Sequence, residues 1–211
     1  MGHLEEGNAN AVWFCSDDKP NIFIIGDSIR LGYEPMLREA FGDEASIFSP
    51  TNENCRTSQH VATSLGLWSN KFDFPKKVDV VQFNCGHWDA AHWFFYPESV
   101  TSLAEYEKNI RMIIYIIKKV YPGAKIVFAT TTPMNPEDPV GVSMNPRSTE
   151  EISRYNAVAV KVATEEGVYV NDLNKFCKDW GAECYSDYCH YTKEAYKLIA
   201  EEVRRFIKTI L

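Results

Sequence analysis

The sequence predicts an α/β fold in which helices cover a central parallel sheet of five strands. Short apolar runs alternate with stretches whose apolar residues recur at helical spacing, and this strand–helix alternation occurs five times. Such a pattern is typical of a parallel sheet between helices. The 211 residues suffice for one α/β domain, and no internal repeat or linker divides them. We therefore expect a lead-in over residues 1–20 and one domain over residues 21–211.

The first half of the chain contains three expected strands and two expected helices. An Ile-rich run between Pro20 and Gly26 indicates a buried strand over 21–25. A helix follows and ends at Gly42, and Pro35 is expected to make its start irregular. The remaining elements are a strand over 45–48, a polar loop over 49–58, a helix over 58–68 and a strand over 78–83. In the lead-in, the apolar residues 12–14 are expected to dock on the core.

The second half continues the alternation. Apolar residues from 103 to 120 recur at helical spacing and stop at Pro122-Gly123. A strand over 125–131 leads to a loop over 134–148, whose length suggests a lid or a substrate-facing excursion. The remaining elements are a helix to Gly167 with a capping-box-like start at Thr149, a strand over 168–173, an irregular segment over 176–189 and a helix capped by Thr192.

Composition argues against several classes of partner. The formal charge of −7 argues against nucleic acids and anionic membranes, and no apolar run is long enough to span a bilayer. The N-terminal residues lack a secretory signal pattern, so a cytoplasmic protein with reduced thiols is expected, unless a signal was removed. The six cysteines form no zinc-type C-x-x-C pair, and Cys177 could pair with Cys184 only in an exported protein.

Four loops that follow strands carry the candidate chemistry. They contain Ser28, then Asn54-Cys55, then residues 86–89, and last residues 187–190. In an open α/β sheet such loops gather at the edge where ligands bind. Ser28 would start a helix, so its hydroxyl lies beside a free backbone N–H, which is half of an acyl-transfer site. The alternative is that Asp27 and Ser28 only cap a helix.

Asp187 and His190 lie three residues apart, so they can hydrogen-bond each other without long-range help. Gly26-Asp27-Ser28, a Gly-x-x-Asp block at Gly86 and Asp187-x-x-His190 together resemble the SGNH (GDSL-type) hydrolase family. The resemblance runs from about residue 20 to 210, in the family's order. It implies a flavodoxin-like three-layer α/β/α fold and ester hydrolysis through an acyl-enzyme. It also implies that Ser28 is the nucleophile, His190 the general base and Asp187 its orienting carboxylate.

Two blocks depart from the family pattern, and both concern the donors that stabilise the oxyanion. Cys55 stands where the family has a Gly whose N–H points into the oxyanion hole, so Cys55 is expected to supply that N–H with Ser28. Trp88 stands where the family has an Asn, and the Trp88 indole or the Asn84 amide is expected to replace that donor. Loss of one such donor costs roughly 2.7–4 kcal/mol, which is compatible with a slow or specialised enzyme.

Further residues near these loops are candidates for substrate binding. Asn54, Arg56, Gly86 and His87 are the expected substrate contacts. Arg30 and Arg56 could meet an anionic or polyhydroxyl substrate, or form surface ion pairs. The aromatic run around 93–96 is interpreted as core packing in preference to a stacking wall for a sugar or acyl group.

The sequence thus predicts a serine esterase that acts on short acyl groups such as acetyl, carried on a small molecule or a carbohydrate. A triad site needs no metal or other cofactor, and none is expected. The alternatives are a non-catalytic carbohydrate-binding relative, an acyltransferase with the same residues, and a metal-dependent phosphoesterase. The last alternative rests on His87, Asp89 and His92, whose spacing suits no regular element well.

Overall fold

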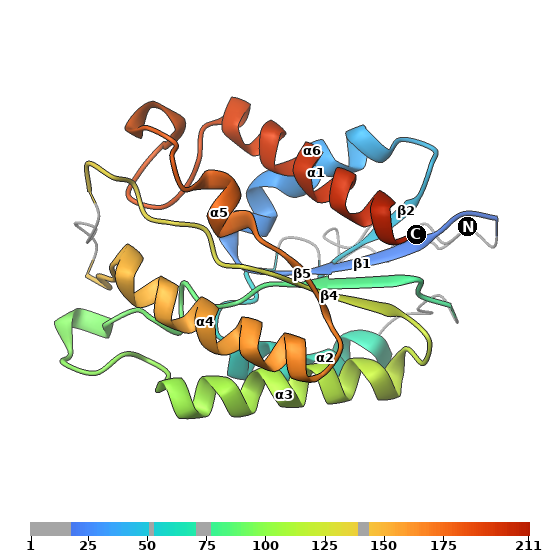
Figure 1. The fold of residues 1–211 in the computed structure, drawn as a ribbon, viewed down its shortest axis with the longest axis horizontal. Coiled ribbons are helices and arrows are strands. Elements are labelled where there is room, and N and C mark those ends of the chain that lie inside the picture. Colours follow the sequence, from blue (N-terminus) through green and yellow to red (C-terminus); the bar gives the residue numbers. More distant parts are fainter. Residues whose placement is uncertain (1–17, 51–52, 71–76, 139–143) are drawn as a thin grey trace, which may run out of the picture.

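The computed structural model of the chain describes residues 18–50, 53–70, 77–138 and 144–211 (Figure 1). The predicted lead-in therefore lies almost entirely outside the described residues, and so do the apolar residues 12–14. Five parallel strands form one sheet in the order β2-β1-β3-β4-β5. These strands are β1 (Asn21–Ile25), β2 (Ser46–Phe48), β3 (Val80–Phe83), β4 (Lys125–Ala129) and β5 (Tyr169–Asn171).

Helices cover both faces of the sheet, which confirms the predicted α/β fold. One layer contains α1 (Ser28–Phe41) and α6 (Lys193–Ile210). The other layer contains α2 (Ser58–Asn70), α3 (Leu103–Val120) and α4 (Thr149–Glu165), as Figure 1 shows. Two short 3-10 helices (Trp93–Phe95 and Ala182–Cys184) and the short helix α5 (Leu173–Cys177) complete the described structure.

Strand side chains alternate between the two layers, so the sheet supplies one apolar core to each face. Ile22 and Ile24 of β1 pack in the core beneath α1 and α6. Phe23 and Ile25 pack in the core beneath α2, α3 and α4. All four are fully buried. A strand buried on both faces reads as a continuous apolar run, which is why this strand could be predicted from sequence.

The close packing of α1 on α6 depends on a glycine. A Cβ at Gly32 of α1 would lie 2.1 Å from the Tyr196 ring of α6. In α6, buried residues Tyr196, Ile199, Val203 and Ile207 recur every three or four positions and form its apolar stripe. This stripe holds α6 on the sheet and thereby fixes the segment that precedes it, which carries Asp187 and His190.

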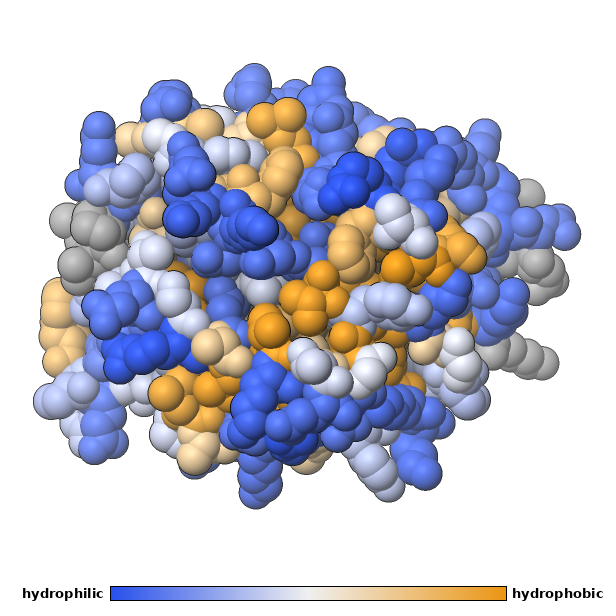
Figure 2. Space-filling view, in the orientation of Figure 1, coloured by the Kyte–Doolittle hydropathy of each residue, from blue (hydrophilic) through white to orange (hydrophobic). Residues whose placement is uncertain are grey.

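The surface agrees with this layered arrangement. In Figure 2, apolar side chains gather in the middle of the face, between the two helical layers, while the outer sides of the layers are mostly hydrophilic. None of the described helices combines the length and apolarity that a membrane span requires.

Several local predictions need correction. Helix α1 runs without interruption from Ser28 to Phe41, with Pro35 inside it, so the proline does not disturb the start of the helix. Helix α4 is capped by Ser148, whose capping box with Glu151 lies one residue before the predicted start. The segment after β5 is not wholly irregular, because it contains α5. Cys177 and Cys184 are both free thiols.

The strand order creates the place where a site can form. From β1 the chain passes to β2 on one side, and it then returns to β3 on the other side of β1. Neighbouring connections that leave in opposite directions open a crevice at the carboxyl ends of β1 and β3. Ser28 follows β1, and the segment 84–89 follows β3.

Candidate active site

Three side chains at this crevice form a continuous hydrogen-bonded series. Ser28 Oγ lies 2.7 Å from His190 Nε2, and His190 Nδ1 lies 2.6 Å from Asp187 Oδ2. Because an ionised carboxylate can only accept, Nδ1 carries the ring proton and Nε2 is free to accept the Ser28 hydroxyl proton. This arrangement is that of a nucleophile, its base and an orienting carboxylate.

The Asp187 carboxylate is held in its charged form by the backbone. Its Oδ1 accepts hydrogen bonds from the N–H groups of Cys189 (2.8 Å) and His190 (2.7 Å). Burial alone would raise the pKa of Asp187, but these backbone bonds and the bond to His190 outweigh it, so the pKa is lowered. An antiparallel bridge between Tyr185 and Tyr191 closes the base of this turn. The local spacing of Asp187 and His190 is therefore enough to form half of the series.

Ser28 is placed by the tight turn between β1 and α1. Asp27 caps the helix, and its Oδ1 accepts the N–H of Ile29 at 3.0 Å. A Cβ at Gly26 would lie 2.0 Å from Asn84 Oδ1, so only glycine fits between the two strand ends. Ser28 is the first residue of the helix, and its N–H has no partner within the helix. The hydroxyl thus stands beside a free backbone donor.

A cavity of about 130 Å³ opens at Ser28 and His190. Four of its lining residues come one from each predicted loop: Ser28, Asn54, Trp88 and His190. The other four are Trp93, Asn145, Arg147 and Tyr188. The structure therefore brings the four strand-end loops together around one small space.

Two of the four predicted oxyanion donors, Cys55 and Asn84, do not face the cavity, whereas Ser28 and Trp88 line it. The Cys55 N–H donates to the Gly26 carbonyl at 3.2 Å, so it is not a free donor. Asn84 is buried against Gly26 and does not line the cavity. Asn54 does line it: its Oδ1 accepts the Arg56 N–H at 3.0 Å, which leaves the Asn54 amide group available. Trp88 also lines the cavity, with its ring beside that of Trp93.

Two residues predicted as substrate contacts, Gly86 and His87, do not line the cavity. Gly86 is buried with φ +150, and a Cβ there would lie 2.3 Å from Thr131 Oγ1. His87 is only 2% exposed, and its Nε2 lies 3.3 Å from Thr132 Oγ1. Burial and the nearby Arg147 hold the pKa of His87 well below its usual range, so the imidazole is neutral. Both residues shape the loop behind the cavity.

Asp89 anchors this loop to the start of α2. Its carboxylate accepts the Ser58 N–H (3.0 Å to each oxygen) and the Ser58 hydroxyl (2.6 Å). Asn109 of α3 donates to the same hydroxyl at 3.0 Å. Since Ser58 directly follows the loop that carries Asn54, the Asp89 contact fixes two walls of the cavity relative to each other.

Asp89 should make stability depend on pH. Burial raises the pKa of Asp89 to about 6, against an ordinary 3.8, although the Ser58 bonds oppose the shift. A raised carboxyl pKa contributes stability below the unfolded-state pKa and loses it as pH rises through the folded-state pKa. Relative to Asp89→Asn, we expect the wild-type unfolding free energy to fall by up to about 3 kcal/mol between about pH 4 and pH 7. Urea denaturation at each pH measures the unfolding free energy. If this free energy depends on pH in the same way in both proteins, the raised pKa of Asp89 is contradicted.

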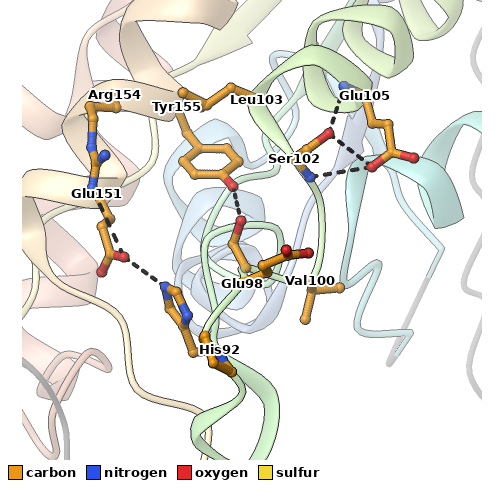
Figure 3. Close-up of a pocket in the computed structure, with 11 residues that line it drawn as sticks. His92, Glu98, Val100, Ser102, Leu103, Glu105, Glu151, Arg154 and Tyr155 are labelled. Carbon is orange, nitrogen blue, oxygen red and sulfur yellow. Dashed lines mark hydrogen bonds and ion pairs between the residues drawn. The ribbon is translucent and has the colours of Figure 1, made fainter.

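A larger second cavity of about 580 Å³ lies between the 92–105 segment and the start of α4 (Figure 3). His92 points toward Glu151 there, with Nε2 2.7 Å from the carboxylate, and this pair ties the aromatic loop to α4. His87, Asp89 and His92 thus contact Arg147, Ser58 and Glu151 respectively, and not one another. The side chains behind the phosphoesterase alternative are not assembled as a metal site.

The metal-compatible group found among the described residues is Asp187, Cys189 and His190, whose ligand atoms lie within 4.8 Å. Asp187 is hydrogen-bonded to His190, which is hydrogen-bonded to Ser28. Burial raises the pKa of the Cys189 thiol to about 12, so no thiolate is available near neutral pH. These donors fit a proton-transfer series better than a metal centre.

The aromatic loop is not core packing, contrary to the prediction. Residues 93–96 are each between 42% and 67% exposed. Phe94 and Phe95 also have left-handed backbone conformations, with φ 50 and 60. Such conformations are costly for residues with a Cβ and occur chiefly where the surrounding structure imposes them. The loop therefore presents aromatic rings beside the cavity, and Trp93 lines it.

Three cavity residues escaped sequence reasoning: Asn145, Arg147 and Tyr188. Asn145 and Arg147 lie in the loop over 134–148, for which only a general substrate-facing role was predicted; residues 139–143 of it lie outside the described residues. Tyr188 lies between Asp187 and His190, so its place was implied by the motif. Arg147 had no signal of its own.

Comparison with known proteins gives consistent results. The sequence profile of the GDSL-like Lipase/Acylhydrolase family matches residues 24–198. GDSL esterase/lipase WDL1 of Oryza sativa subsp. japonica is 29% identical over 114 residues, which are 50% of this chain and 44% of that protein. GDSL esterase/lipase CPRD49 of Arabidopsis thaliana is 28% identical over 205 residues, 90% of this chain and 79% of that protein. The match to WDL1 thus spans less than half of that relative's length.

Solved structures show the same fold at low identity. The lipase/acylhydrolase from Enterococcus faecalis superposes with a TM-score of 0.71 at 20% identity, covering 91% of this chain and 97% of that one. Est24, a carbohydrate acetylesterase from Sinorhizobium meliloti, superposes with a TM-score of 0.64 at 13% identity, covering 92% and 100%. These similarities show the architecture and not the substrate.

Proposed function

Because the chain belongs to the GDSL-like lipase/acylhydrolase family, we propose that it is a serine esterase that cleaves short acyl esters through an acyl-enzyme. The observation that carries this proposal is the series Ser28–His190–Asp187, which opens on a cavity with room for a small acyl group. A helix-capping role alone would not require the His190 imidazole at hydrogen-bond distance from Ser28 Oγ.

In this proposal each residue of the series has one step. Ser28 Oγ attacks the ester carbonyl carbon while its proton passes to His190 Nε2, and Asp187 stabilises the resulting imidazolium. The proposed oxyanion donors are the Ser28 N–H, the Asn54 amide group and the Trp88 indole. Collapse of the tetrahedral intermediate expels the alcohol, which takes the proton from His190. A water then attacks the acyl-enzyme carbonyl while His190 takes its proton, and His190 returns that proton to Ser28 Oγ as the acid leaves.

Cavity size supports a small acyl group such as acetyl. A water molecule takes up about 30 Å³ of liquid, so a space of about 130 Å³ corresponds to only a few waters. The rings of Trp88, Trp93 and Tyr188 around the opening suit stacking against a sugar that carries the ester. The likeness to a carbohydrate acetylesterase agrees with this choice of alcohol.

We expect hydrolysis of p-nitrophenyl esters to fall steadily from acetyl to octanoyl. An acyl chain too long for the cavity either strains its walls, at about 1–3 kcal/mol, or shifts the ester carbonyl away from Ser28, so kcat/KM should drop by at least about tenfold across the series. Initial rates of p-nitrophenol release measure this, with Ser28→Ala as the control for non-enzymatic reaction. A rate that rises with chain length would contradict the short-acyl assignment.

A further inference from the structure

One residue of the catalytic cavity, Arg147, is not used by the proposed hydrolysis. It is 93% buried, with 7% of its surface exposed, and it lines the cavity beside Ser28 and His190. Its guanidinium lies 5.3 Å from the centre of the Tyr188 ring. A cation at this place in the wall of a small cavity needs a partner, because burial of an uncompensated charge is costly.

None of the hydrogen-bond partners of Arg147 carries a negative charge. Nε donates to His87 Nδ1 at 3.3 Å, Nη1 to the Asn145 carbonyl at 3.3 Å, and Nη2 to Cys189 Sγ at 3.4 Å. The His87 imidazole and the Cys189 thiol are both neutral, for the reasons given above. Of the N–H donors of the guanidinium, one on each terminal nitrogen takes part in none of these bonds. A guanidinium with a donor left on each terminal nitrogen has the donors that a carboxylate binds.

Most other arginines of this protein do have a carboxylate partner, so the lack of one at Arg147 is unusual here. Every other arginine except Arg56 lies within 4.0 Å of a carboxylate oxygen: Arg30, Arg38, Arg111, Arg154, Arg204 and Arg205. Arg147 and Arg56 have no such partner among the described residues. Asp27 forms no ion pair with Arg147. The Arg147 charge lowers the pKa of Asp27, but burial has the larger effect and raises it.

Arg56 does not line the cavity, but it contacts a ring that does. Its guanidinium lies 5.8 Å from the centre of the Trp88 ring, which lines the opening. The backbone of Arg56 is left-handed, with φ 49, and its N–H is held by Asn54 Oδ1. The two arginines without carboxylate partners thus flank the aromatic rings where the alcohol part of an ester would lie.

We propose that the preferred substrate is an acetyl ester of an acidic sugar, whose carboxylate binds to Arg147 with Arg56 at the rim. This inference rests on the proposed esterase function and names its substrate class. The guanidinium of Arg147 supplies the charge and the paired donors, and the rings of Trp88 and Trp93 supply the surface for the sugar. His87 acts as a positioning residue, because its neutral Nδ1 accepts from Arg147 Nε and fixes the plane of the guanidinium.

The test compares two esters that differ only in charge: an O-acetylated methyl glucuronoside and its carboxamide with the acetyl group at the same position. Acetate release by wild type should favour the carboxylate ester by about tenfold or more in kcat/KM, because the carboxylate forms a charge-assisted pair with Arg147 that the carboxamide cannot form. Arg147→Gln should remove this preference, because it should lower kcat/KM on the carboxylate ester by about tenfold more than on the carboxamide. Arg205→Gln, which removes the same charge from an exposed pair on α6, should keep the preference.

Three results would overturn the inference. Equal rates of the wild type on both esters would leave the esterase function intact and remove the acidic substrate. An equal loss on both esters in Arg147→Gln would place Arg147 at the reacting ester and not at a carboxylate. If the tenfold preference remains in Arg147→Gln, another residue binds the carboxylate. The wild-type ratio requires no variant, so a folding defect in Arg147→Gln cannot hide the first outcome.

Binding without hydrolysis separates this inference from the proposed function. Ser28→Ala should bind methyl glucuronoside more tightly than methyl glucoside, measured by ligand-observed NMR titration, and the added Arg147→Gln change should abolish the difference. If neither ester is hydrolysed but this difference is present, the carboxylate site stands and the esterase proposal fails. If Ser28-dependent hydrolysis occurs and the difference is absent, the carboxylate site is wrong.

Discussion

Replacement of Ser28 by alanine should lower kcat/KM for p-nitrophenyl acetate by about 10⁴- to 10⁶-fold. Ser28 Oγ is the atom that attacks the carbonyl, and no other hydroxyl stands at 2.7 Å from His190 Nε2 among the described residues. The substitution removes only the partly buried Ser28 Oγ, and the helix keeps its N-cap Asp27, so the fold should persist. Steady-state p-nitrophenol release measures the loss, and circular dichroism checks the fold.

Two comparisons sharpen this prediction. Ser153→Ala on α4 changes an exposed hydroxyl that bonds only within its own helix, and it should leave the rate unchanged. The double variant Ser28→Ala with His190→Ala should be no slower than Ser28→Ala alone, because residues that act as a unit lose their contribution together. A Ser28→Ala enzyme that keeps more than about a hundredth of wild-type activity would require another nucleophile.

Replacement of Arg30 by methionine should lower the unfolding free energy by about 3–5 kcal/mol, the largest stability effect we expect. Arg30 is fully buried, although it was predicted as a possible substrate contact or surface pair. It forms an ion pair with Glu34 and donates to the carbonyls of Pro50 (3.2 Å) and Glu53. These contacts join α1 to the loop that carries Asn54. Methionine fills similar volume but leaves these acceptors without their donor.

Arg38→Met is the matched control, because Arg38 pairs with the same Glu34 from a position 30% exposed. Its loss leaves the Arg30–Glu34 pair in place and removes bonds to the Ile47 carbonyl and Ser49 Oγ from a partly exposed side chain, so it should cost less, about 1–2 kcal/mol. Urea unfolding of both variants gives the two free energies, provided that their slopes agree with wild type. If Arg38→Met costs as much as Arg30→Met, then Arg30 does not anchor the loop.

Much of this structure could be predicted because the signals are local. The run from Asn21 to Ile25 is buried on both sides, so its apolar continuity marks a strand. Asp187 and His190 meet within one turn, so their spacing alone brings them into contact. The meeting of His190 with Ser28 is not local, and it followed from the order of the strands and the family resemblance.

The remaining site residues could not be placed from the sequence, because their side-chain orientations and backbone hydrogen bonds depend on tertiary contacts. Cys55 stands at the predicted position, but a backbone bond to Gly26 takes up its N–H. His87 and Asn84 are turned into the interior by packing against Thr132 and Gly26. Arg147 lies in an irregular loop without periodicity, so only tertiary structure places it at the cavity. Side-chain orientation in such loops is set by distant contacts and not by neighbours in sequence.

The central claim is that Ser28 becomes acylated, and intact-protein mass spectrometry after rapid acid quench tests it directly. With p-nitrophenyl acetate in excess, the protein should gain the mass of one acetyl group, and peptide mapping should place it on Ser28. Ser28→Ala should show no such adduct under the same conditions. Turnover of the ester without an adduct on Ser28, or an adduct that persists in Ser28→Ala, would contradict the account.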